Sequence, residues 1–185
     1  MKRNLLLIFT ILIVLFSCKS PEARKPVQYK SGSFISTSIQ RNKAIFEKEE
    51  LKIIELLEAT KNQAYFSSES GFWYYYDVKD STQTKVPKYG DNVNFSYDVK
   101  KLNGVTVLSK NEIGLQNCII DQTNQELISG IRDGLKLMKE GETITFLFPS
   151  YKAYGYYGIE NKLGTNIPIQ CTVTLNSINK TNENY

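Results

Sequence analysis

The chain has 185 residues, with 23 Lys and Arg against 19 Asp and Glu, no His, and a formal net charge of +4. Without an imidazole, Ser-His-Asp and Cys-His catalysis are excluded, and the three dispersed cysteines do not form a zinc-binding cluster. Lysines are interleaved with acidic residues and form no basic stripe, so we expect no nucleic-acid partner. We also expect no metal and no cofactor.

Residues 1–17 have the pattern of a signal peptide, in which two basic residues precede an apolar stretch from Leu5 to Phe16. This stretch is shorter than the roughly 20 residues that a membrane-spanning helix needs. The junction Leu15–Cys18 resembles the lipobox of bacterial lipoproteins, which implies cleavage before Cys18 and lipidation of its thiol. We therefore expect a lipid-anchored protein of the cell envelope that faces the periplasm. A free buried cysteine at the end of an apolar segment is the alternative.

Residues 18–38 are rich in Pro, Ser, Gly and Lys and show little apolar periodicity, which predicts a flexible tether. In the next segment, 39–64, apolar residues recur at helical spacing, and we predict an amphipathic helix from about Asn42 to Lys61. Its apolar stripe consists of Phe46, Ile53, Ile54 and Leu57. This stripe could pair two copies of the chain, or it could pack against the helix's own domain, which is the commoner arrangement.

A single domain is predicted over 65–180, where apolar and polar residues alternate with the period of β-strands. An aromatic run starts this pattern, and Asn103-Gly104 is typical of a hairpin turn. One short helix is predicted from Leu127 to Met138, ended by Gly141. The predicted strands lie at 72–76, 93–99, 105–107, 144–148 and 169–175. The pattern indicates an α+β fold, with a curved antiparallel sheet that closes on one short helix.

The domain contains three motifs that resemble FKBP-type peptidyl-prolyl cis-trans isomerases and follow the family order. They are NFSYDV (Asn94–Val99), ELISGIRDGLKLMKEGE (Glu126–Glu142) and FPSYKAYG (Phe148–Gly155). Together with the anchor and the preceding helix, the chain is similar to the membrane-anchored lipoprotein members, and in particular to gliding-motility-associated FKBP-type lipoproteins. The resemblance implies an FKBP-like sheet wrapped on one helix. It also implies an isomerase that assists folding of exported or envelope proteins by acting on their proline-containing segments.

The same resemblance implies where the site lies. Tyr97 matches the pocket tyrosine, Ile128 matches the residue whose backbone N–H meets the substrate carbonyl, and Tyr154 matches the tyrosine whose hydroxyl donates to the substrate. These three residues are the expected catalytic positions. The expected substrate-binding residues are Val107, Leu108, Cys118, Ile120, Leu127, Ile131, Leu163 and Cys171.

Several of these positions depart from the family pattern. Ile131 stands where a tryptophan is usual, Cys118 and Cys171 replace phenylalanines, and Leu108 replaces the aspartate that pairs with the pocket tyrosine. A catalytically weak FKBP-fold binding module or chaperone is therefore the alternative to an isomerase. The two cysteines could pair in an oxidising compartment, but a disulfide needs Cα atoms roughly 4.4–6.8 Å apart. Rings that touch across a pocket can stand on more distant backbones, so we expect two free thiols.

Overall fold

The computed structural model describes residues 32–122 and 126–180; the predicted signal peptide, Cys18 and most of the predicted tether lie outside these ranges. A boundary between two compact units falls after Thr37, and the site lies within Ser38–Tyr185. Among the described residues, no helix combines the length and the apolar character needed to cross a membrane. In the same ranges, no cluster of Cys, Asp and Glu could hold a metal ion.

The first described element is helix α2, Gly32–Ala59. It begins earlier than the predicted Asn42, so the end of the predicted tether is helical, and it stops just before Lys61. The difference has a physical cause, because Gly32 is the last strong helix breaker in this part of the chain. The Ser and Thr residues that follow have only moderate helix propensity, but they can extend a helix that the later residues nucleate.

The apolar stripe of α2 packs against the helix's own domain. The side chain of Ile53 is fully buried. The ring of Phe46 meets that of Tyr151 edge-on, with 4.8 Å between the ring centroids and 61° between the ring planes. The prediction that the stripe packs on its own domain is confirmed for these two residues.

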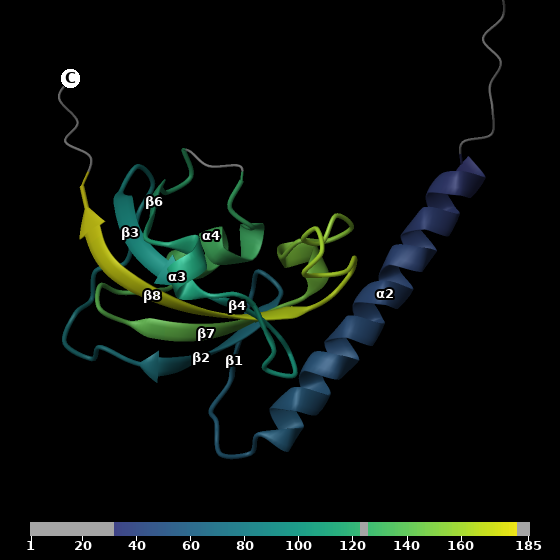
Figure 1. The fold of residues 1–185 in the computed structure, drawn as a ribbon, viewed down its shortest axis with the longest axis horizontal. Coiled ribbons are helices and arrows are strands. Elements are labelled where there is room, and N and C mark those ends of the chain that lie inside the picture. Colours follow the sequence, from purple (N-terminus) through teal and green to yellow (C-terminus); the bar gives the residue numbers. More distant parts are fainter. Residues whose placement is uncertain (1–31, 123–125, 181–185) are drawn as a thin grey trace, which may run out of the picture. The chain divides into compact units, whose positions relative to one another are not determined.

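The rest of the domain is one eight-stranded antiparallel sheet that curves around helix α4 (Figure 1). Six strands follow the order β1-β2-β7-β8-β3-β6, and the β4-β5 hairpin joins the same sheet through β8. The strands are β1 Phe66–Ser68, β2 Phe72–Val78, β3 Asn92–Tyr97, β4 Val99–Lys101, β5 Thr106–Leu108, β6 Gln116–Ile119, β7 Thr143–Phe148 and β8 Ile169–Asn179. The predicted α+β fold is confirmed.

Asp98 divides the strand that was predicted over 93–99 into β3 and β4. Its backbone N–H donates to the Thr172 carbonyl at 3.2 Å, and its carboxylate accepts from the Thr172 N–H at 3.0 Å. These bonds take the place of regular strand pairing at Asp98. The alternation of apolar residues along the sequence gives no sign of such an irregularity. The predicted hairpin turn is confirmed, because Gly104 closes the turn between β4 and β5 by donating to the Lys101 carbonyl at 2.9 Å.

The predicted helix over 127–138 is shorter in the structure, where α4 spans Ser129–Leu135. Ile128 before it has an extended backbone (φ −56°, ψ 142°), and a turn from Leu137 N–H to the Gly134 carbonyl closes its other end. Leu127 and Met138 lie outside the helix but are still buried. Sequence periodicity thus identified residues that face the core and overestimated the helical length.

Four short elements lie outside the predicted segments: strands β1 and β6, helix α3 (Lys110–Ile113) and the 3-10 helix η1 (Ser150–Lys152). Helix α3 had a local signal, since the Ser109 hydroxyl accepts from the Glu112 N–H and the Glu112 carboxylate accepts from the Ser109 N–H. This reciprocal capping box satisfies two backbone donors at the start of a helix. The prediction of a single helix among the strands is therefore wrong, because α3 and η1 are present besides α4.

The core lies between α4 and the sheet, where two glycines allow a close approach. A Cβ added to Gly130 would lie 2.6 Å from the Phe148 ring, and one added to Gly134 would lie 2.8 Å from the Phe146 ring. Both distances are shorter than van der Waals contact, so larger residues would push the helix off the sheet. This packing fixes the start of α4, which carries Ile128, relative to β7 and β8.

Candidate functional site

All eleven expected site residues belong to the hydrophobic core of the domain or pack against it. Seven of the eight expected substrate-binding residues are buried, at 9% exposure or less. They are Val107, Cys118, Ile120, Leu127, Ile131, Leu163 and Cys171. Four residues of the set are only partly buried and form its accessible part: Tyr97, Leu108, Ile128 and Tyr154. The structure therefore brings the expected residues together and divides them into a floor and an accessible rim.

Ile128 presents a backbone donor at the rim. Its carbonyl accepts from the Arg132 N–H at 3.3 Å and so begins α4, while its own N–H has no acceptor among the described residues. An unpaired N–H beside apolar side chains is costly to keep away from water, and a substrate carbonyl could satisfy it. The role that the resemblance implies for Ile128 is compatible with this geometry.

Tyr97 and Tyr154 form a pair of neighbouring phenols. Tyr97 is the last residue of β3, opposite Val173 of β8, and Tyr154 follows η1. Burial is the main cause that raises the pKa of both hydroxyls, and each tyrosine also influences the pKa of the other. Leu108 lacks the polar group that an aspartate would offer to Tyr97. Both phenols stay neutral at physiological pH, so the pair can donate a hydrogen bond to a carbonyl.

The floor of the site is apolar and contains two cysteines. Ile131 and Cys171 are fully buried, and Cys118 is 4% exposed. Cys118 pairs with Val93 of β3, whereas Cys171 lies on β8 and pairs with Phe146 of β7. Because β3 separates the two cysteine-bearing strands, the thiols do not face each other, and both are free. The prediction of two free thiols is confirmed, and burial raises the pKa of both.

A contact from α2 holds the segment that carries Tyr154. The carboxylate of Glu49, 3% exposed, accepts from the Ser150 N–H and from the Ser150 hydroxyl, both at 2.7 Å. The Ser150 carbonyl in turn accepts from the Ala153 and Gly155 N–H groups at 2.9 Å each. Glu49 therefore fixes the turn that positions Tyr154.

Sequence reasoning missed Glu49, although a signal was present. Glu49 lies between Phe46 and Ile53 on the apolar stripe, where a carboxylate interrupts an otherwise hydrophobic helix face. A charged residue on a buried helix face needs hydrogen-bond partners. Such a residue is therefore expected to contact another part of the fold. Its partner, 101 residues later in the chain, could not be identified from spacing.

The arrangement can bind and bend a peptide, but it offers no acid–base chemistry. Two neutral phenols and one backbone N–H lie around an apolar floor, and none of the eleven described site residues carries a carboxylate or an amine. Rotation about an X–Pro bond needs no proton transfer, because its barrier of roughly 18–20 kcal/mol arises from amide resonance. A dry pocket that favours the twisted amide over the planar one would lower this barrier.

Comparisons with known proteins support the fold and identify a family. The family model for FKBP-type peptidyl-prolyl cis-trans isomerases matches residues 83–176, just over half of the chain. The structure resembles that of FkpA from Escherichia coli, with 20% identity, a TM-score of 0.57 and coverage of 97% of this chain and 83% of that one. It also resembles a peptidyl-prolyl cis-trans isomerase from Pseudomonas syringae pv. tomato str. DC3000, with 18% identity, a TM-score of 0.57 and coverage of 75% and 96%. No curated protein matches the sequence.

Proposed function

We propose that this chain, which belongs to the FKBP-type peptidyl-prolyl cis-trans isomerase family, catalyses X–Pro isomerisation at the site formed by Tyr97, Ile128 and Tyr154. The observation that carries the proposal is the placement of these three groups over one apolar floor. The pyrrolidine ring would lie against the partly buried rings of Tyr97 and Tyr154, with the buried Ile131 and Cys171 in the floor below. The Ile128 N–H and the tyrosine pair would hold carbonyls on either side of it in a bent conformation.

An isomerisation assay on a proline-containing tetrapeptide tests this proposal. We expect the full chain, kept in solution with mild detergent, to accelerate isomerisation above the spontaneous rate. Peptides with different residues directly before the proline should be compared, because the floor of the site lacks the usual large rings. Folded protein that accelerates none of these peptides would contradict the isomerase proposal.

A second candidate function is a binding module or chaperone of low catalytic activity. It is favoured by the floor, where cysteines and isoleucine replace aromatic rings, and by the near-complete burial of the residues that would contact proline. A protein of this kind would bind proline-containing segments without accelerating their isomerisation. Equilibrium binding of the same tetrapeptides therefore separates the two functions.

We further propose that the clients are exported or envelope proteins and that lipid at Cys18 anchors the chain to a membrane, facing the periplasm. The apolar run before Cys18 and the lipobox-like junction support this, and the similarity to gliding-motility-associated lipoproteins extends the proposal to that process. Cys18→Ala should move the protein from the membrane fraction to the soluble fraction. A variant that stays in the membrane with unchanged mass would contradict lipidation.

Self-association through α2 is a further part of this proposal. Ile39 and Leu51 are 62% and 66% exposed, so apolar side chains remain on the helix beside those that pack on the domain. Burial of such residues between two copies would be favourable. Analytical ultracentrifugation of the chain in detergent would reveal a dimer, and Leu51→Lys should weaken it.

A further inference from the structure

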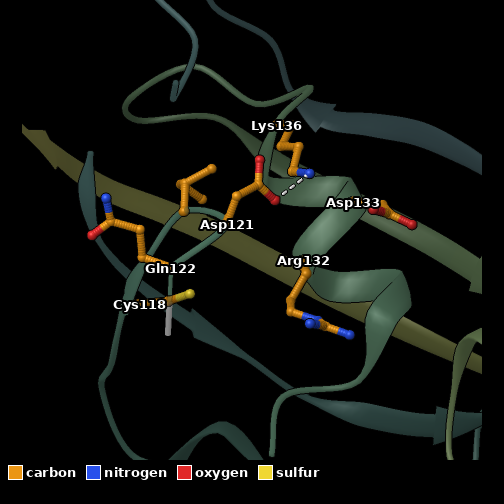
Figure 2. Close-up of a pocket in the computed structure, with 7 residues that line it drawn as sticks. Cys118, Asp121, Gln122, Arg132, Asp133 and Lys136 are labelled. Carbon is orange, nitrogen blue, oxygen red and sulfur yellow. Dashed lines mark ion pairs between the residues drawn. The ribbon is translucent and has the colours of Figure 1, made fainter. Parts of the chain in front are cut away.

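A cavity of about 220 Å³ lies between β6, with the turn that follows it, and α4 (Figure 2). One wall is the end of β6 and the turn after it, which contribute Cys118, Ile120, Asp121 and Gln122. The other wall is α4 with the residue that follows it. Arg132 and Asp133 lie on the helix, and Lys136 comes directly after its last residue, Leu135.

Arg132 carries the one charge in this cavity that has no opposite charge against it. Lys136 pairs with Asp121 at 2.6 Å, and Asp133 pairs with Lys152 at 2.8 Å. Arg132 forms no ion pair with a described residue, and its Nε is buried without a hydrogen-bond partner in the described part of the chain. The cavity therefore combines two neutralised pairs with one unpaired guanidinium.

An unpaired guanidinium in a polar cavity favours an anion with two acceptor oxygens. Carboxylates meet this geometry, because a guanidinium can donate two parallel N–H bonds to their oxygens. The buried Nε–H would also gain the partner that it lacks. The remaining cavity wall contributes the thiol of Cys118, a small neutral group that leaves room beside the guanidinium.

The cavity adjoins the apolar core beneath the proposed proline site. Cys118 and Ile120 line it and also belong to the apolar cluster of that site. The Arg132 N–H donates to the Ile128 carbonyl, which places Arg132 one helical turn, about 5.4 Å, from the residue that would hold the substrate backbone. An extended peptide advances about 3.3–3.6 Å per residue, so a side chain within about two residues of the proline can reach Arg132.

We infer that Arg132 binds the carboxylate of an Asp or Glu side chain close to the proline of the client, so that acidic X–Pro segments are preferred substrates. This inference rests on the proposed function, because it assigns a substrate class to the same site. Arg132 would act as a specificity residue, and the tyrosine pair and Ile128 would bind the backbone regardless of sequence.

Paired peptides that differ only by Glu or Gln test the inference on the full chain in mild detergent. The variable residue is placed in turn at four positions, the two before the proline and the two after it. Both the isomerisation rate and equilibrium binding are measured for each peptide. At one position we expect the Glu peptide to be favoured about tenfold, as a charge-assisted hydrogen bond would allow. Raising the salt concentration should reduce the preference, since partly exposed charges are screened.

Variants assign the preference to one side chain. Arg132→Gln should reduce the Glu-to-Gln ratio to about one, and Arg132→Lys should leave an intermediate ratio, because lysine keeps the charge but loses the two-pronged donor geometry. Lys48→Gln on exposed α2 is the control with the same change in net charge, and it should keep the full ratio. If Arg132→Gln does not fold, the salt dependence in the unmodified chain still tests the inference.

The two readouts separate failure of the inference from failure of the proposed function. Equal rates and equal binding for Glu and Gln peptides at all four positions would overturn the acidic preference while leaving isomerisation intact. A preference that persists in Arg132→Gln would also overturn it. A binding preference without any acceleration would support the role of Arg132 and contradict isomerase activity.

Discussion

The two sides of the proposed site are held in place by different means. On the sheet side, Ile131 of α4 and Cys171 of β8 are fully buried, and Cys171 lies within a continuous hydrogen-bonded ladder. On the loop side, the segment after Pro149 depends on a few contacts, chiefly that of Glu49 with Ser150. The sheet side therefore sets the size of the pocket, whereas the loop side sets the position of Tyr154 and is the easier side to change.

The largest effect is expected from Gly158→Ala on the loop side. Gly158 has φ of +63°, and a Cβ there would lie 2.2 Å from the Leu163 carbonyl oxygen. Strain and overlap together should lower the free energy of unfolding by about 2–4 kcal/mol, measured by chemical denaturation. Gly104→Ala is the control, because it has φ of +83° but no atom within 4 Å, and should cost only about 1 kcal/mol. Equal losses would show that the Leu163 segment moves freely.

Glu49→Ala should have the next largest effect. It leaves the Ser150 N–H and hydroxyl without their acceptor, which should cost about 2–3 kcal/mol of stability. It should also reduce kcat/KM, because the turn before Tyr154 loosens. The neighbouring Glu50→Ala, on an exposed position, is the control and should change stability by less than about 0.5 kcal/mol. If both variants have the same Tm, the α2 contact does not hold the loop.

Tyr154→Phe should have a modest effect that is confined to activity. Loss of one neutral hydrogen bond corresponds to about 1 kcal/mol, or about fivefold in kcat/KM. The ring keeps its packing, so the Tm should change little. Tyr157→Phe, at a side chain that is 91% exposed, should have no effect on the rate. An unchanged rate in Tyr154→Phe would remove its hydroxyl from the mechanism.

The smallest effect concerns the sheet side and its thiols. Burial raises the pKa of Cys171 well above its ordinary value of 9.0, so the folded state keeps the proton while the unfolded state loses it. The stabilising effect is complete below pH 9 and declines as pH rises further. Between pH 8 and pH 10, the stability of Cys171→Ala should therefore fall less steeply than that of the unmodified chain. Parallel slopes would contradict the raised pKa.

The sequence allowed prediction of the sheet side better than of the loop side, and the cause is physical. Alternation along β3, β7 and β8 reports which strand residues face the core, and this includes Cys171. Helical spacing with Leu127 and Leu135 did the same for Ile131. Glu49 and Ser150 meet across 101 residues, and no local pattern encodes such a contact. The unpaired state of Arg132 was equally hidden, because it depends on which lysines neutralise Asp121 and Asp133.

Strand β8 has a consequence for how the sheet forms. It is the last strand in the described part of the chain, and it bonds to β7 on one side and to β3 and β4 on the other. Without Ile169–Asn179, β2 with β7 and β3 with β6 are separate pieces, each with an unpaired edge. The sheet can therefore close only after β8 has paired on both sides.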